Sequence, residues 1–451
     1  MALGGGKWLF QNKKLPGTYI NFVSKDRASI DVAERGYGTM PLELDWGASG
    51  KIFRVSAEDF IKSSQEIFGY DYGHEKMKPL RDLYKHLKVG YFYRLNGNGE
   101  TAKNDLATAK YPGIRGNDIT ISVQNDIDNS DSFIVKTFIK TNDVLKVVDI
   151  QKNITKVSDL KDNAFVIWDK SVTLKVNAGS TLSGGTNGAS VTVADYQKYI
   201  ELIEPYYFNI IAYAGSDTTI KNLLVNFTKR CREETGSKFQ LIVHGLEKVN
   251  YEGVISVKND VLDNLSNKGE IVYWLCGKEA SCAINASCTN ALYDGEYKVK
   301  TSYKQFELEQ SLENGMLTFH NVSDSVGGNV VGDVRVLADI NTFTEFTKEK
   351  NIDFSLNQVV RVLDNAALDI ARIFNKMYLG KVQNDDSGRI SLWKDGVKLF
   401  EEYQRVRAIQ NFKDKDLPVP SQGDEKTSVV WSFEIQPTTC MEKLYCTVVV
   451  A

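Results

Sequence analysis

The sequence predicts a multidomain α/β (α+β) protein with a layered α/β core, an inserted all-β sandwich-like domain, a C-terminal α/β domain and an extended β-strand arm at each terminus. Three observations support this: a length of 451 residues, helix-like segments that alternate with strand-like ones, and a block of closely spaced strands without helices. A single hydrophobic core stops growing at about 250–300 residues, so we expect two to four domains. We place the boundaries at 1–26 (N-terminal arm), 27–104 and 179–345 (two parts of the core), 105–178 (insert), 346–438 (C-terminal domain) and 439–451 (C-terminal arm).

The composition is that of a folded protein, with 42% apolar and 25% charged residues. A formal net charge of −3 gives no basic footprint, so we expect no contact with nucleic acid. The sequence has no run of about 18 apolar residues, so we expect no insertion into a membrane. The start, "MALGGGKWLF", lacks the apolar stretch of a secretory signal, and six cysteines fit a reducing compartment. We therefore expect a soluble protein made in a cytoplasm.

The first part of the chain begins with a strand and continues with helices. Residues 18–24 alternate β-branched and aromatic side chains after Pro16-Gly17, a pattern typical of a strand. The segment "SAEDFIKSSQEIFG" has apolar residues at helical spacing. A second helix-like segment, "KPLRDLYKHL", leads into the strand-like "VGYFYRL", which is typical of α/β layers.

The β insert is indicated by a change of pattern after residue 105. Five short segments, from "DITISVQ" to "VTLKVN", alternate apolar and polar residues and are separated by Asn, Asp, Gly and Ser. Strands at such close spacing, with no helix between them, predict a small sandwich or barrel. The Gly/Ser-rich stretch "NAGSTLSGGTNGAS" is expected to be the linker that closes the insert.

The alternation of helices and strands returns after this linker. A helix is expected between Asp217, as its N-cap, and Gly236, with a strand on either side. The apolar run "EIVYWLCG" is expected to be another buried strand. The clearest helix is predicted to begin at Ser355, with a capping box formed with Gln358, and to end at Gly380. A connector containing prolines then precedes the strand-like "SVVWSFEIQP" and the terminal strand.

Motifs of catalytic and cofactor sites fail their structural requirements. "GNGETA" has the glycine spacing of a dinucleotide site, but strands rather than a helix are expected to follow it. Cys276, Cys282 and Cys288 lie six residues apart, which is not a usual metal-ligand spacing. The four histidines are scattered, and His244, at the end of a strand, has no evident triad partner. We therefore expect no enzyme, no cofactor and no metal.

A family resemblance extends over nearly the whole chain. It rests on these segments in this order: "LPGTYINF", "PLELDWG", "AKYPGIRGNDITI", "LSGGTNG", "YQKYIELIEPYYFNIIAY", "VRVLADINTFTEFT", "NQVVRVLDNAALDIARIFNKMYLGKV" and "CMEKLYCTVVV". The chain resembles contractile tail sheath proteins of myophages and phage tail-like bacteriocins, in particular the prophage-like branch of Gram-positive bacteria. "GKEASCAINAS" and "RISLWKDGVKLFEEYQ" match the family only loosely.

The resemblance implies a structural protein rather than an enzyme. Sheath subunits form six-fold rings that stack helically around an inner tail tube, and they contract on a signal from the baseplate to drive the tube through a cell envelope. The implied partners are further copies of the chain, the tube protein, and baseplate and tail terminator proteins. The implied location is the bacterial host cytoplasm during assembly, and then a phage tail or an extracellular tail-like particle.

The resemblance also implies that both terminal arms add strands to a sheet of neighbouring subunits. The N-terminal arm strand would consist of Gly17, Thr18, Tyr19, Ile20, Asn21, Phe22 and Val23. The C-terminal arm strand would consist of Lys443, Leu444, Tyr445, Cys446, Thr447, Val448, Val449 and Val450. The strand that accepts them would consist of Val429, Val430, Trp431, Ser432, Phe433, Glu434 and Ile435. On the residues alone, the alternative that each terminal strand pairs within its own subunit stays open.

By the same resemblance, the C-terminal domain faces the tube and the β insert lies on the outside of the particle. Candidate tube contacts are the charges off the apolar stripe of the 355–379 helix: Arg361, Asp364, Asp369, Arg372 and Lys376. The alternative is an ordinary solvated helix face. Two other classes stay open from the residues: a soluble α/β enzyme or ligand-binding protein with a β insert, and another tail component such as a tube or baseplate protein.

Overall fold

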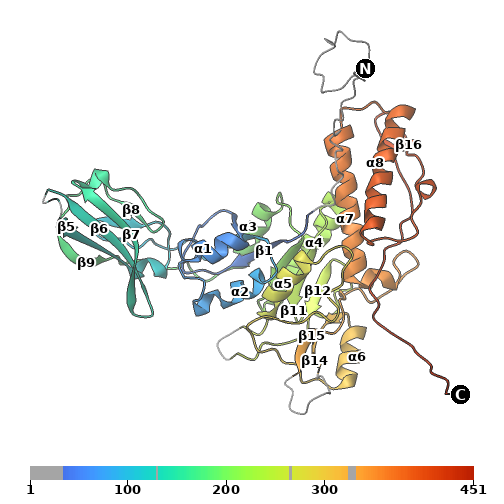
Figure 1. The fold of residues 1–451 in the computed structure, drawn as a ribbon, viewed down its shortest axis with the longest axis horizontal. Helices are drawn as coiled ribbons and strands as arrows, with labels where there is room; N and C mark the ends of the chain where they lie inside the picture. The colour runs from blue at the N-terminus through green and yellow to red at the C-terminus, as the bar shows by residue number, and fades with distance from the viewer. Residues whose placement is uncertain (1–33, 128, 130, 264–266, 323–331, 451) are drawn as a thin grey trace, which may run out of the picture.

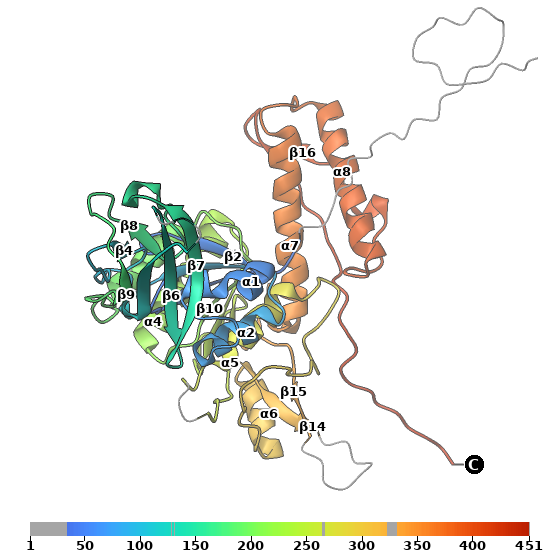
Figure 2. The same ribbon diagram turned by 60° about the vertical axis from the view of Figure 1, so that its left-hand side comes forward.

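The computed structural model describes residues 34–450 except 128, 130, 264–266 and 323–331. Its three parts follow one another in space: the β insert, the α/β core, and a helical C-terminal domain that stands off the core (Figure 1). The last residues leave the C-terminal domain as an extended chain (Figure 2). The prediction of a multidomain α/β protein with a β insert is confirmed. The predicted N-terminal arm, residues 1–26, lies outside the described residues.

The core is built on a seven-stranded sheet with the order β13-β12-β11-β10-β1-β3-β2. Its strands are β1 (Tyr37–Leu42), β2 (Phe53–Ser56), β3 (Val89–Arg94), β10 (Ile210–Tyr213), β11 (Gln240–His244), β12 (Val254–Val257) and β13 (Met316–Leu317). Neighbouring strands are parallel except at the edge, where β2 is antiparallel to β3. Strands such as β10 are buried on both faces, which explains their continuous apolar sequences.

Helices cover both faces of this sheet. The core helices are α1 (Ala57–Phe68), α2 (Lys78–Tyr84), α3 (Val193–Ile203), α4 (Thr218–Arg230), α5 (Ile271–Ser281) and α6 (Gln305–Glu313). One face packs against α1, α2 and α5, and the other against α3 and α4. Successive strand residues divide between the two cores, Ile210 on the first and Ile211 on the second. The predicted cap of α4 is confirmed, since the Asp217 carboxylate accepts the N–H of Thr219 and Ile220.

The segment predicted to be the strand "EIVYWLCG" forms helix α5, so that prediction is wrong. Of its 11 residues, 8 are buried, because α5 lies between the sheet and α2. Gly277 permits the close approach, since a Cβ at this position would lie 2.2 Å from the Leu83 carbonyl oxygen. A helix buried on nearly all sides has no amphipathic period, and its short apolar run cannot be distinguished from that of a buried strand.

The insert is a small sandwich with its own hydrophobic core. A four-stranded antiparallel sheet has the order β7-β6-β5-β9, and a short pair, β4 and β8, belongs to the same core. The strands are β4 (Ala107–Ala109), β5 (Ile119–Asn125), β6 (Phe133–Thr141), β7 (Val144–Ile154), β8 (Val166–Trp168) and β9 (Asn177–Thr181). Strand β9 continues past the predicted boundary at 178, because it pairs with β5. The first residues of the predicted linker are therefore a strand, and only the residues after Thr181 connect the insert to the core.

The C-terminal domain consists mainly of two long helices that lie side by side, with extended segments packed on them (Figures 1 and 2). The helices are α7 (Asn357–Ile373) and α8 (Asp386–Arg405), and the short strands are β16 (Ser421–Gln422) and β17 (Val429–Val430). A further hairpin, β14 (Phe319–Val322) and β15 (Asp333–Val336), lies below the core. The domain is therefore more helical than the predicted C-terminal α/β domain, because only two residues on each side pair in its sheet.

Helix α7 begins at Asn357, so the capping box predicted for Ser355 and Gln358 is not formed. The Ser355 hydroxyl instead donates to Ile352 O at 2.7 Å within a turn of 3₁₀ helix. Gln358 is buried and binds the backbone before the C-terminal arm. The helix lacks a side-chain cap because Ser355 is used within the preceding turn and Gln358 is used in a tertiary contact.

Candidate assembly interface in the C-terminal domain

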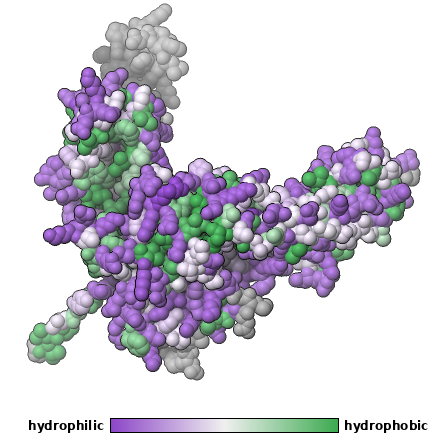
Figure 3. Space-filling view, turned by 180° about the vertical axis from the view of Figure 1, so that it is seen from behind, coloured by the Kyte–Doolittle hydropathy of each residue, from purple (hydrophilic) through white to green (hydrophobic). Residues whose placement is uncertain are grey.

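Beyond its first residues, the C-terminal arm is an extended segment that the other described residues leave exposed. Residues 441–450 are all exposed, and Leu444, Tyr445 and Val449 are 90%, 89% and 86% exposed. Within the described part of the chain, no backbone hydrogen bond joins this segment to another. Its tip is an apolar projection into solvent (Figure 3). The segment from Lys443 to Val450 therefore has no strand partner among the described residues, and its pairing with a neighbouring subunit stays a prediction.

The segment predicted to accept the arms, Val429–Ile435, has the side-chain alternation of a strand. Val429, Trp431, Phe433 and Ile435 pack against the core of the C-terminal domain, while Val430, Ser432 and Glu434 are exposed. Gly396 on α8 makes room for the indole, because a Cβ there would lie 2.2 Å from Trp431 Cη2. Trp431 also donates its Nε1–H to Pro418 O at 2.8 Å. These contacts hold the segment extended along α8.

Most of the backbone of this segment has no hydrogen-bond partner among the described residues. Only Val429 and Val430 lie in a ladder, with Gln422 and Ser421. Among the described residues, none forms a backbone hydrogen bond with residues 431–435. An extended backbone with free N–H and C=O groups is a template for another strand. Apolar surface gathers over this domain (Figure 3), and Phe374, Leu392 and Val429 line a hollow in it.

Three of the five predicted tube contacts are buried inside the subunit, so the prediction is wrong for them. Arg361, Asp364 and Asp369 are 1%, 9% and 2% exposed. The Arg361 and Asp364 side chains bind groups of the core, and Asp369 accepts the hydroxyl of Tyr403 on α8. Arg372 and Lys376, in the last turns of the helical segment, are exposed, and their role at a tube stays a prediction.

The first half of α7 is bound to the core through polar contacts. Arg232 forms a bidentate ion pair with Asp364, with N–O distances of 2.6 and 2.8 Å. Gln240 on β11 donates to Asn357 Oδ1 at 3.0 Å, and Arg35 donates to Asn365 Oδ1 at 3.0 Å. Burial works against the charge of Arg232, but Asp364 raises the pKa of its guanidinium. Asp364, which was predicted to lie on an exposed face of the helix, thus joins the C-terminal domain to the core.

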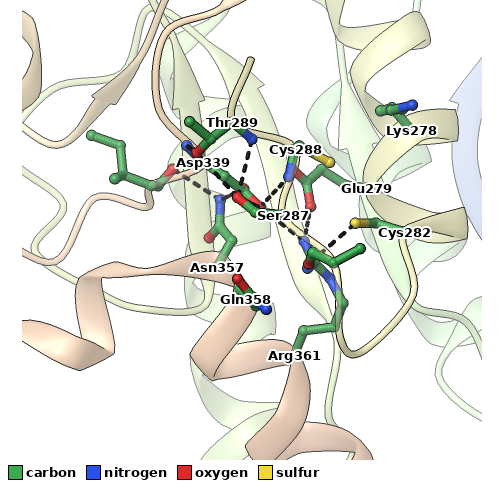
Figure 4. A network of polar contacts seen from close by, with 12 residues as sticks. Lys278, Glu279, Cys282, Ser287, Cys288, Thr289, Asp339, Asn357, Gln358 and Arg361 are labelled. Carbon is green, nitrogen blue, oxygen red and sulfur yellow. Dashed lines mark hydrogen bonds and ion pairs between the residues drawn. The ribbon is translucent and has the colours of Figure 1, made fainter. Parts of the chain in front are cut away.

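Arg361 is the centre of a second buried cluster (Figure 4). Its guanidinium donates to Glu279 Oε2 at 2.6 Å, to Asp339 Oδ2 at 3.2 Å and to Ala286 O at 2.7 Å. Burial raises the pKa of Glu279 well above its usual range. Burial opposes ionisation of Asp339 too, but Arg361 and several hydrogen bonds lower its pKa. The Arg361 cation therefore faces the Asp339 carboxylate, which stays charged, and the Glu279 carboxyl group, which holds a proton more easily. The buried positive and negative charges are thus balanced.

Glu279, Cys288 and Asp339 are the described groups whose atoms could hold a metal ion, since one ligand atom from each lies within 4.8 Å of the others. Arg361 already contacts both carboxylates. A metal cation would have to compete with this fixed guanidinium at close range. The arrangement therefore fits an ion-pair cluster, and we assign no metal to it.

The arm begins beside this cluster. Gln358 donates to Thr438 O at 3.1 Å and accepts the N–H of Cys440 at 3.0 Å. Thr289 donates to Glu442 Oε1 at 2.7 Å. We call residues 438–442 the arm root. The sequence does not predict the arm root, because Gln358 stands at the position of a helix cap and its contacts with residues 438 and 440 are 80 or more residues away in the chain.

No described helix is long and apolar enough to cross a membrane. The described residues form a layered α/β body with a β-sandwich insert, a helical C-terminal domain and an exposed extended apolar segment at the end. Models of phage tail sheath proteins match three successive parts of the chain: the β-sandwich domain at 96–187, the central domain at 189–342 and the C-terminal domain at 349–451.

Known proteins support the same classification. The sheath tail protein of Desulfitobacterium hafniense is 32% identical and matches 90% of this chain and 93% of its own, with a TM-score of 0.76. The phage-like element PBSX protein XkdK of Bacillus subtilis is 27% identical over 481 positions, covering 98% of each chain. The contracted helical sheath of the anti-feeding prophage shares the fold, with 12% identity, a TM-score of 0.57 and coverage of 97% of this chain and 99% of that chain. The chain belongs to the phage tail sheath family, and it is a structural subunit of a contractile sheath rather than an enzyme.

Proposed function

We propose that this chain polymerises into six-fold rings stacked helically around an inner tail tube, and that the polymer contracts to drive the tube through a target cell envelope. Neighbouring subunits are joined by strand addition. One observation supports the proposal: the chain has both an exposed extended apolar segment, Lys443–Val450, and a second extended segment whose backbone at 431–435 has no hydrogen-bond partner among the described residues.

The geometry favours a joint between different copies. The arm leaves the base of the C-terminal domain and points away from β16 and the end of α8 (Figures 1 and 2). A chain would have to fold its arm back sharply to reach its own Val429–Ile435 segment. The arm of a neighbouring copy is therefore the occupant that fits this segment. The N-terminal strand, Gly17–Val23, is proposed to add beside it in the same way.

The magnitudes favour cooperative assembly. Ordering an eight-residue arm opposes docking by about 8–16 kcal/mol, at about 1–2 kcal/mol per residue. Burying its five large apolar side chains stabilises by about 8–15 kcal/mol, at roughly 1.5–3 kcal/mol each. Docking of one arm alone is thus near balance. Several arms and body contacts, held at high effective concentration in a growing ring, make assembly favourable.

The remaining partners follow from the proposed assembly. The exposed end of α7, with Arg372 and Lys376, would face the inner tube through contacts that salt weakens. Baseplate and tail terminator proteins would hold the two ends of the polymer. The β insert, at the far end of the molecule from the C-terminal domain, would lie outside. Assembly would take place in the bacterial cytoplasm, before the sheath acts on a phage tail or an extracellular tail-like particle.

Electron microscopy of the purified chain over a concentration series tests the proposal. We expect hollow striated tubes or stacked rings from the full chain, and small particles from a chain that ends at Cys440. Glu434→Pro should also stop assembly, because proline removes a backbone N–H from the accepting segment. Glu434→Ala is the matched control and should assemble, since the Glu434 side chain is exposed. Assembly of the shortened chain to the same extent as the full chain would rule out the C-terminal joint.

A further inference from the structure

The loop that follows α5, and that lies beside the arm root, carries two neighbouring thiols. Cys282 follows the last residue of α5, and Cys288 lies six residues later. The turn between them is closed by a hydrogen bond from Ala286 N to Ala283 O at 3.1 Å. The Cys282 thiol donates to Ala286 O at 3.6 Å, and Figure 4 shows its sulfur beside that of Cys288. Both cysteines are free thiols, so the fold holds two reducing groups next to each other.

The two thiols differ in their surroundings. Cys282 is partly exposed, whereas Cys288 is fully buried. The neighbouring Cys288 thiol, acting against burial and together with Arg361, lowers the pKa of Cys282 to about 7. The same contact, together with burial, raises the pKa of Cys288. Cys282 is therefore the more exposed and the more easily ionised of the two thiols, and Cys288 lies behind it, which is the order needed for attack and then resolution.

The loop is connected to three parts of the subunit. Arg361 of α7 donates to Ala286 O at 2.7 Å, and Asn285 donates to Val406 O, after α8, at 2.8 Å. Cys288 N donates to Asp339 Oδ2 at 2.8 Å. The next residue, Thr289, binds Glu442 of the arm root. A covalent bond across the loop would therefore restrain the point at which the arm is attached.

We propose that Cys282 and Cys288 are a redox-sensitive dithiol that closes to a disulfide when the folded chain meets a low-molecular-weight disulfide, and that closure restrains the arm root. The proposal rests on the proposed function in one respect: the chain would meet the oxidant after a particle has left the reducing interior of a cell. It requires no assembly, so it can be tested on the single chain.

The chemistry is ordinary thiol–disulfide exchange. The Cys282 thiolate attacks one sulfur of the small disulfide, which forms a mixed disulfide and releases one small thiolate. The small thiolate released in this step takes up the proton of Cys288, and the Cys288 sulfur attacks the Cys282 sulfur. The second small thiolate leaves. One small disulfide is reduced to two thiols, and two cysteines are oxidised to one cystine.

The test uses the full chain with Cys440→Ser and Cys446→Ser, which removes the two exposed thiols. The chain is treated with oxidised glutathione at neutral pH, then unfolded in acid, alkylated, and cleaved with trypsin. Cys282 and Cys288 fall in one tryptic peptide, 279–298. We expect this peptide to lose two hydrogens and take up no alkylating agent, whereas the buried Cys231 and Cys276 become fully alkylated. Full alkylation of both Cys282 and Cys288 would overturn the proposal.

Limited proteolysis of the native chain tests the effect on the arm root. Trypsin can cut after the exposed Lys443. We expect oxidation to slow this cut several-fold, and we expect a chain that also carries Cys288→Ser to show no such change. An unchanged rate in a chain whose disulfide has formed would overturn the restraint of the arm root.

Discussion

The ion pair between Arg232 and Asp364 gives the sharpest prediction, because it joins α7 to the core. The two side chains are only 6% and 12% exposed. Removing one partner of a buried pair leaves the other charged and unpaired, which typically lowers stability by about 3–5 kcal/mol. Arg232 also donates to Phe239 O at 2.8 Å. We therefore expect Arg232→Met to destabilise by about 3–5 kcal/mol and Asp364→Leu by a similar amount.

The double variant separates a true pair from two independent residues. Arg232→Met with Asp364→Leu buries no unpaired charge, so we expect it to be more stable than the sum of the single changes by about 2 kcal/mol or more. The matched control is Arg230→Met. Its exposed pair with Glu204, with side chains 42% and 33% exposed, should contribute at most about 1 kcal/mol.

Urea unfolding of the dilute chain, followed by tryptophan fluorescence, measures these differences. Trp393 and Trp431 belong to the C-terminal domain, so separation of that domain is visible as an early transition. We expect the early transition to move to lower urea in each single variant and to recover in the double variant. Equal midpoints for Arg232→Met and Arg230→Met would refute the view that this pair fixes α7 to the core.

Three further predictions follow from other contacts. Burial raises the pKa of Asp82 to about 6, above its unfolded value of about 3.9, so the stability it contributes is present below about pH 4 and is lost as the pH rises through 6; melting temperatures from pH 4 to 7 should show this loss, and Asp82→Asn should flatten it. Gly396→Val should displace Trp431 and prevent assembly in electron micrographs, while the far-ultraviolet circular dichroism of the chain is unchanged. Gly277→Val should lower the melting temperature, since forcing α5 away from α2 destabilises by about 1–3 kcal/mol.

The sequence predicted the layers of the fold correctly, but it predicted a strand where the structure has helix α5. Amphipathic helices such as α4 and alternating strands such as β6 carry a period that shows which face is buried. Helix α5 has no such period because it is covered on nearly all sides, and only the packing of Gly277 on Leu83 shows why a helix fits there. The arm strand predicted at Lys443–Val450 is an exposed extended segment in the structure, and its pairing with a neighbour stays a prediction. Gln358, predicted to cap α7, instead binds the arm root.

The candidate site shows the limits of reading charge from a helical pattern. Asp364 and Asp369 lie off the apolar stripe of α7, and from the sequence this position indicates a solvated face. Their partners, Arg232 and Tyr403, are 132 and 34 residues away in the chain. Pairing over such separations depends on tertiary structure. Through these pairs the polar face of α7 binds the core and α8. The extended course of Val429–Ile435 was predictable because apolar alternation is a local property, whereas its role as an accepting strand stays a prediction.

The continuity of α7 has a mechanical consequence. The helix has 17 residues, so it is about 25 Å long at 1.5 Å per residue. Its first half is fixed to the core, and its far end carries the accepting segment and the exposed Arg372. A turn of the core by roughly 20° would move that far end by about 9 Å along an arc of this radius. In the proposed ring, a modest rotation of each subunit against its neighbours would therefore become a displacement of several ångströms at the tip of α7, enough to separate that tip from the proposed inner tube.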